Sequence, residues 1–239
     1  MFRKTKGAQL NCFSPPVMIA TMVIEVSLAL YTVWRYKLDV FTRLVVLTLV
    51  ALAGFQMAEY FVCTGSIGHP AFWSRMGFVA ITALPPLGVH LLHVLADKPG
   101  RKLVAFSYAT MAAFMLYFTL YSAAFTGHQC TGNYVIFQLH VSSGGAYAVY
   151  YYGWLLAGLG LGGRWANQLM AKGKNAHQQL QTVRALMLGW LVFLVPTALA
   201  NTFSPESRRA IPSVMCGFAV LFALILSLYI LPRTANSKT

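Results

Sequence analysis

Seven stretches of the chain are almost entirely apolar and about as long as a membrane is thick. A bilayer core is about 30 Å across, so a helix that crosses it needs about 20 mostly apolar residues. The stretches are Pro15–Arg35, Phe41–Cys63, Trp73–Ala96, Leu103–Ala124, Ser142–Gly162, Val183–Ala200 and Ala210–Leu231. Inside lipid the backbone polar groups must bond within their own segment, which favours helices over strands. The pattern therefore predicts an all-α polytopic membrane protein, a bundle of seven transmembrane helices.

The segments between these stretches are short, which predicts one transmembrane domain over residues 1–239. The longest connections are Phe125–Val141 and Gly163–Thr182, and neither is long enough to hold a folded domain. We therefore expect no separate catalytic or DNA-binding module. The chain also shows no internal repeat of the kind on which many transporters are built.

The composition agrees with a membrane protein and excludes two other classes. Of the 239 residues 58% are hydrophobic and only 10% are charged, against roughly 25% charged in an ordinary soluble domain. A soluble globular enzyme is therefore excluded. An aromatic content of 14% excludes a disordered chain, because disordered segments are poor in aromatic residues.

The basic residues predict the orientation of the bundle. With the N-terminus outside, 12 of the 18 Lys and Arg residues fall on inner loops and 6 on the outer side. Cytoplasmic loops carry the excess of Lys and Arg, so we expect an outer N-terminus and a cytoplasmic C-terminus. The net charge of +13 is then an orientation signal that anionic lipid of the bilayer reinforces, and no nucleic-acid partner is expected.

The N-terminal residues favour the opposite orientation. Arg3-Lys4-Thr5-Lys6, followed by an apolar stretch, resembles the basic start of a signal peptide. No small-residue cleavage site follows the first stretch, which ends instead in Trp34-Arg35-Tyr36-Lys37. We interpret the stretch as a retained helix, and an inner N-terminus stays open as the alternative.

Three of the four cysteines fall on the expected outer side. Cys12, Cys63 and Cys130 lie near the outer face, and Cys216 lies early in the last helix. The outer side of a bacterial inner (plasma) membrane, the expected location, is oxidising. A Cys63–Cys130 bridge would tie the second helix to the long outer loop, with Cys12 left over. Free thiols that pack as small apolar groups are the alternative.

Two of the five acidic residues fall inside the predicted membrane spans. Glu25 lies near the middle of the first helix and Glu59 in the outer third of the second. Gln56, Glu59 and Cys63 are spaced i, i+3, i+7 and share one helical face. That face must look into the bundle, because lipid cannot solvate a carboxylate. Each Glu is then either a neutral group that bonds helices together or a proton-responsive or cation-binding group in a polar cavity.

Two constellations could hold zinc or another divalent metal. His90, His93 and Asp97 follow the helix-kinking Pro85-Pro86 on one face. They could ligate a metal or relay protons, although a hydrogen-bonded cluster at the membrane interface is the favoured interpretation. Cys12, Glu59 and His140, with His128 in the same outer loop, could bind zinc with an open coordination position.

Two classes of seven-helix protein are excluded by missing residues. A retinal protein needs a Schiff-base lysine in its last helix, and Ala210–Leu231 has none. The zinc hydrolases related to alkaline ceramidases and adiponectin receptors carry a late His-x-x-x-His, and here no histidine follows His177.

Two resemblances add to this picture. Cys12-Phe13-Ser14 and Phe55-Gln56-Met57-Ala58-Glu59 resemble an uncharacterised bacterial membrane family, whose members typically begin Met-Cys-Phe-Ser and carry a Gln-x-x-Glu pair at the end of the second helix. Here eleven residues precede Cys12. The layout is also similar to the seven-helix sensor module of some bacterial histidine kinases, through Trp73, Pro85-Pro86, an aromatic fifth helix and a sixth helix that closes on Pro196-Thr-Ala-Leu-Ala-Asn201. The kinase itself is absent.

These observations favour a membrane protein that binds or senses a small molecule or an ion and has no output domain. The expected ligand-binding residues are Glu25, Gln56, Glu59, Tyr147 and Tyr151. Binding would shift the helix packing, and a cytoplasmic or membrane signalling partner, or a second copy of the chain, would read the shift. The alternatives are a proton- or cation-coupled transporter of small solutes and a membrane-embedded metal-dependent hydrolase.

Overall fold

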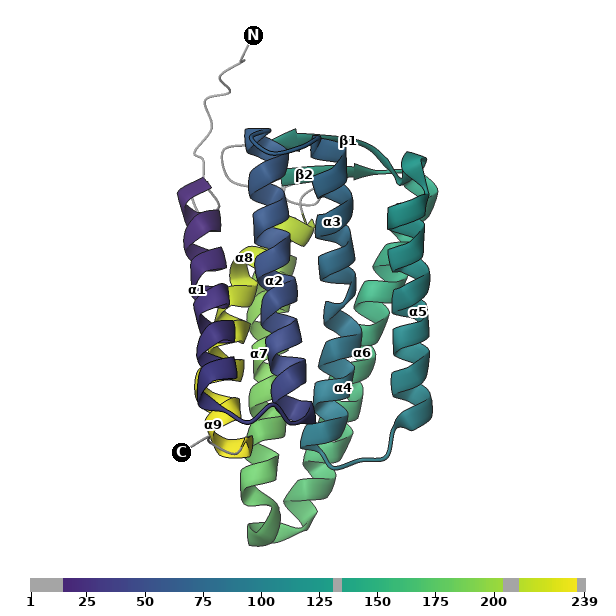
Figure 1. Ribbon diagram of the computed structural model, residues 1–239. Coiled ribbons are helices and arrows are strands. Elements are labelled where there is room, and N and C mark those ends of the chain that lie inside the picture. Colours follow the sequence, from purple (N-terminus) through teal and green to yellow (C-terminus); the bar gives the residue numbers. More distant parts are fainter. Residues whose placement is uncertain (1–14, 131–134, 204–210, 236–239) are drawn as a thin grey trace.

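The computed structural model describes residues 15–130, 135–203 and 211–235, which form a bundle of long helices (Figure 1). The helices are α1 (Pro15–Arg35), α2 (Val40–Thr64), α3 (Pro70–Thr82), α4 (Leu84–Leu95), α5 (Arg101–Leu120), α6 (Val141–Ala171), α7 (His177–Phe203), α8 (Ile211–Leu224) and α9 (Leu231–Thr234). A π-helical segment, Ile225–Ile230, joins α8 to α9. Since α3 continues into α4 and α8 into α9, the described part is arranged as seven rods.

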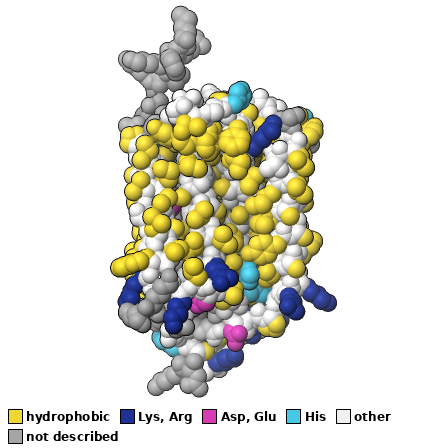
Figure 2. Space-filling view, in the orientation of Figure 1, with side chains coloured by type: hydrophobic (Ala, Val, Ile, Leu, Met, Phe, Trp, Pro, Cys, Tyr) yellow, Lys and Arg dark blue, Asp and Glu magenta, His cyan; other side chains and the backbone are white. Residues whose placement is uncertain are grey.

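Six of these rods are long and apolar enough to cross a membrane. They comprise α1, α2, the α3–α4 rod, α5, α7 and the α8–α9 rod. The fifth rod along the chain, α6, is outside this set. Hydrophobic side chains cover most of the visible face, and Lys and Arg gather mainly toward the end where α6 and α7 are joined (Figure 2). The chain thus has the architecture of a helical multipass membrane protein.

The limits of the helices follow from local chemistry. The Asp39 side chain accepts a hydrogen bond of 2.7 Å from the backbone N–H of Thr42 and caps α2. The same helix ends at Gly65, whose φ of 60° is the left-handed conformation that glycine adopts without strain. The helix is interrupted at Ala83, between α3 and α4 and two residues before Pro85, close to the predicted kink at Pro85-Pro86. Proline lacks the backbone N–H that would continue the helix.

A two-stranded hairpin lies across one end of the bundle (Figure 1). Strand β1 (Phe125–Cys130) pairs antiparallel with β2 (Val135–Leu139). The hydropathy pattern indicates only a plain connection here and predicts a fourth helix that runs to Ala124, whereas α5 ends at Leu120. Val135, Ile136 and Phe137 are buried, so β2 belongs to the core and closes this end of the bundle.

A disulfide fastens the hairpin to the helices. Cys63, at the end of α2, is bonded to Cys130, the last residue of β1, with a Cα–Cα distance of 5.7 Å. This is the pairing that the sequence analysis weighed against free thiols. The bridge closes a sequence separation of 67 residues, and it holds β2 over the ends of α2 and α3.

Candidate functional site: an aromatic cavity beside a buried carboxyl pair

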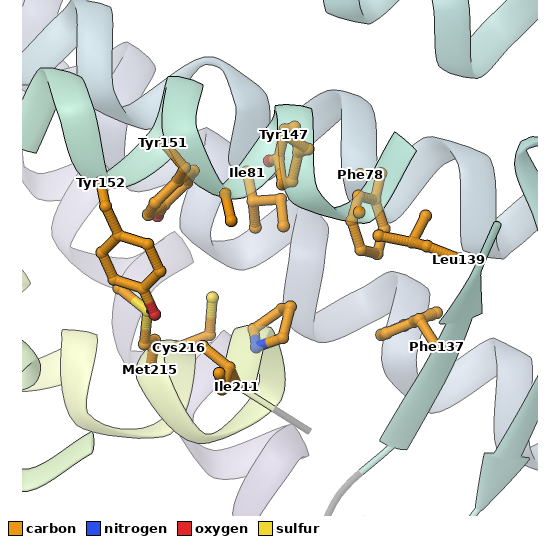
Figure 3. A pocket seen from close by; sticks show the side chains of 13 residues that line it. Phe78, Ile81, Phe137, Leu139, Tyr147, Tyr151, Tyr152, Ile211, Met215 and Cys216 are labelled. Atoms are coloured by element: carbon orange, nitrogen blue, oxygen red, sulfur yellow. The ribbon is translucent and has the colours of Figure 1, made fainter. Parts of the chain in front are cut away.

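A cavity of about 210 Å³ lies beneath the hairpin, between α3, α6 and α8 (Figure 3). Its walls are mainly aromatic and aliphatic side chains. They are Phe78 and Ile81 from α3, Phe137 and Leu139 from β2, Gly144, Tyr147, Ala148, Tyr151 and Tyr152 from α6, and Ile211, Pro212, Met215 and Cys216 from α8. None of these thirteen residues carries a formal charge, so the cavity suits an uncharged molecule.

Three tyrosines of α6 supply the polar groups of this cavity. The hydroxyl of Tyr147 is hydrogen-bonded to the hydroxyl of Thr82 at 3.1 Å. Tyr152 reaches toward α8 and donates to the sulfur of Met215 at 3.6 Å (Figure 3). The Tyr151 ring lies between these two, with its centroid 5.9 Å from Tyr147 and 6.1 Å from Tyr152. Two of the predicted ligand-binding residues, Tyr147 and Tyr151, therefore line one cavity.

The opposite wall was not foreseen from the sequence. Cys216 is a free thiol that is 3% exposed, and it lines the cavity together with Met215. Phe137 and Leu139 of β2 close the cavity at the hairpin end. A run of β-branched and aromatic residues, Val135-Ile136-Phe137, after Gly132-Asn133 is the signal that could have indicated the second strand of a hairpin.

The two membrane carboxyls lie elsewhere, in a closed cluster. Glu25 is 0% exposed, Glu59 1% and Gln56 3%, and none of the three lines the tyrosine cavity. The expectation that they share one cavity with the tyrosines is therefore corrected. The cause is geometric, because α1 and α2 pack on each other and on α8, whereas the tyrosines of α6 approach α8 from the side of α3.

Ser213 of α8 connects the carboxyl cluster to the hairpin. Its hydroxyl is hydrogen-bonded to Glu59 and accepts a hydrogen bond of 3.3 Å from the backbone N–H of Val135 in β2. Three residues further along α8, Cys216 interacts electrostatically with both Glu25 and Glu59. Helix α8 thus lies between the carboxyl cluster and the cavity.

The histidines of α4 each have a partner of their own. The Nδ1 atom of His90 is hydrogen-bonded to the hydroxyl of Tyr108 at 3.1 Å. The Nδ1 atom of His93 lies 2.8 Å from the carbonyl oxygen of Val89, and its ring packs edge-on against Trp165. Asp97, the third member of this predicted cluster, is exposed. Each histidine therefore has a hydrogen-bond partner outside the predicted set, and among the described residues no hydrogen bond joins His90, His93 and Asp97 to one another.

The second predicted metal set falls partly outside the structure. Cys12 lies outside the described residues, Glu59 is buried, and His140 is exposed at the start of α6. Within the described ranges, no group of three or more His, Cys, Asp and Glu side chains is placed to hold a metal ion.

Comparison of the chain with protein-family models, with curated proteins and with solved structures finds no match in any of the three. The resemblances to an uncharacterised bacterial membrane family and to the sensor module of histidine kinases therefore stay predictions.

Proposed function

We propose that this protein is a membrane receptor that binds a small, uncharged and mostly apolar molecule in the tyrosine-lined cavity. The observation that carries the proposal is the cavity itself, which combines apolar walls with three phenol groups. Binding sites for small molecules are commonly of this kind, apolar with a few well-placed polar groups.

The size and chemistry of the cavity narrow the class of ligand. Its volume of about 210 Å³ is below the roughly 300 Å³ at which drug-sized sites begin, so the ligand is small. Phe78, Phe137 and Tyr151 offer aromatic faces for a flat molecule. The phenols of Tyr151 and Tyr152 can donate to a carbonyl or hydroxyl oxygen of the ligand.

In our proposal α6 is a seventh membrane span, with the N-terminus outside and the C-terminus in the cytoplasm of a bacterial cell. The length of α6, 31 residues, and its place beside the other rods in Figure 1 support this arrangement. The Cys63–Cys130 disulfide suits the oxidising outer side of the plasma membrane. The cavity then lies at the depth of the outer leaflet.

The proposed output is a change in helix packing. A ligand held between α6 and α8 favours the state in which these helices fit around it, and it shifts the equilibrium only by its difference in affinity for two states. A cytoplasmic or membrane partner would recognise the changed helix packing at the inner end of α6 and α7, where Arg164, Lys172 and Arg184 lie.

Comparing the binding of an uncharged and a charged aromatic molecule of similar size tests the proposed class of ligand. We expect the purified chain in a neutral detergent to bind 1-tetralone, an uncharged aromatic ketone, in a saturable way. It should bind 1-naphthoate, an anion of similar size, at least tenfold more weakly, because no lining residue can pair with its charge. Equilibrium dialysis measures both affinities. Equal affinities, or no saturable binding of the ketone, would contradict the proposal.

A further inference from the structure

The carboxyl cluster is a second unusual feature of the molecule and does not depend on the proposed ligand of the cavity. Glu25 comes from α1 and Glu59 from α2, and the two carboxyls are close enough for their charges to interact. Both side chains are sealed from the surface, at 0% and 1% exposure. Buried carboxyls normally have hydrogen-bond partners or a counter-charge, because an unpaired one is costly.

Most of the oxygen atoms in this pair have no partner. Within the described residues, both oxygens of Glu25 and Oε1 of Glu59 accept no hydrogen bond. Only the other oxygen of Glu59 is satisfied, by the hydroxyl of Ser213. By contrast, the carboxylate of Asp39 is bonded to a backbone N–H. Three buried carboxyl oxygens of the described residues are therefore without a hydrogen-bond partner.

The part of the chain that the structure describes supplies no buried Lys or Arg to balance the pair. Among the described residues, the thiol of Cys216 on α8 interacts electrostatically with both carboxyls, and a thiol cannot become positive. A bound cation would supply both the missing charge and the missing contacts.

We propose that Glu25 and Glu59 form a binding site for one sodium ion. The site offers only oxygen atoms, from the two carboxyls and the hydroxyl of Ser213, and the amide of buried Gln56 lies one turn earlier on the same face of α2. Hard cations prefer oxygen ligands. One sodium ion and one proton together neutralise the two carboxylates. Two protons alone would also neutralise them, and a midpoint of unfolding that follows pH and not sodium is the result expected of that state.

A divalent ion fits this site less well. Calcium takes six to eight oxygen ligands, and magnesium needs a near-octahedral set. The described part of the chain contains no group of three or more acidic, cysteine or histidine side chains placed for a metal. A pair of carboxyls that shares one proton carries a single negative charge, which a monovalent ion balances.

The proposed ion would fasten α1 to the bundle. This helix packs mainly on α2 and α8, which are the elements that carry the other groups of the site. Sodium should therefore stabilise the native state by binding it and not the unfolded chain. In Figure 1, α1 stands at the edge of the bundle, so the bound ion would join this outer helix to α2 and α8 from within.

Thermal unfolding of the full chain in a neutral detergent tests the site. We expect the midpoint to rise by about 5 °C from choline chloride to saturating NaCl at one pH and one ionic strength, and KCl to give a much smaller rise. Glu25→Gln and Glu59→Gln should each abolish the sodium-dependent rise. Asp97→Asn, which changes an exposed acid, should keep it.

If the variants fail to fold, binding of ²²Na⁺ to the wild-type chain tests directly whether the protein binds sodium. We expect about one ion per chain, displaced by unlabelled Na⁺ and poorly by K⁺. The proposal would be overturned if the unfolding midpoints in NaCl and choline chloride were equal and no ²²Na⁺ were bound. It would also be overturned by a full sodium response in Glu25→Gln, or by an unfolding midpoint that follows pH alone.

Discussion

At the scale of single residues, the four aromatic positions Tyr147, Tyr150, Tyr151 and Tyr152 of α6 have different roles. Tyr147, Tyr151 and Tyr152 line the cavity, whereas Tyr150 points to α3 and donates to the carbonyl oxygen of Thr82 at 2.7 Å. The sequence indicated that this run could not all face one way. It could not say which members face a cavity, because that depends on where α3 and α8 pack.

We predict that Tyr151→Phe weakens the binding of 1-tetralone about fivefold, the effect of losing one hydrogen bond worth about 1 kcal/mol. Equilibrium dialysis at one temperature measures the change. Tyr150→Phe is the matched control, since it removes a phenol of the same helix that does not line the cavity. The control should lose some thermal stability and keep its affinity. The same loss of affinity in both variants would argue against a role of Tyr151 in the cavity.

At the scale of elements, close contact between α6 and α7 depends on glycine. A Cβ atom at Gly158 would lie 2.7 Å from the ring of Trp190 on α7, and at Gly162 2.9 Å from the side chain of Met187. These glycines are four residues apart, the spacing that lets membrane helices approach closely. Trp190 is only 2% exposed, so the contact is part of the core.

Gly158→Ala should lower the free energy of unfolding by about 1–3 kcal/mol, because the added methyl group overpacks the core against Trp190. Gly153 of the same helix is a matched control, since a Cβ atom there meets nothing within 4 Å. Gly153→Ala should be neutral or stabilise the helix by up to about 1 kcal/mol. Thermal or denaturant unfolding compares the two, and equal effects would contradict this account of the contact.

The elements also show what the sequence could and could not predict. Hydropathy placed the rods well because a bilayer demands about 20 apolar residues in a row, wherever the helices later pack. It missed β1 and β2, which are short and are held by contacts between distant segments, the Cys63–Cys130 bridge and the burial of Val135. The separation of Glu25 and Glu59 from the tyrosines was equally hidden, since it follows from contacts between distant segments.

At the scale of the whole molecule, α8 divides two compartments. On one side lies the cavity, walled by Met215 and Cys216. On the other lies the carboxyl pair, to which α8 contributes Ser213. The hairpin touches both, because Phe137 lines the cavity and the backbone of Val135 is bonded to Ser213. A structural change in the cavity or at the carboxyl pair can therefore be transmitted to the other through α8 and β2.

The central claim is that the cavity beneath the hairpin binds a small uncharged molecule, and filling it tests that claim most directly. Ala148→Phe places a ring in the cavity and removes no polar group. Ala157→Phe places the same ring on the exposed face of α6. The measurement is the affinity for 1-tetralone by equilibrium dialysis. We predict at least a tenfold loss in Ala148→Phe and none in Ala157→Phe, and an unchanged affinity in Ala148→Phe would contradict the account.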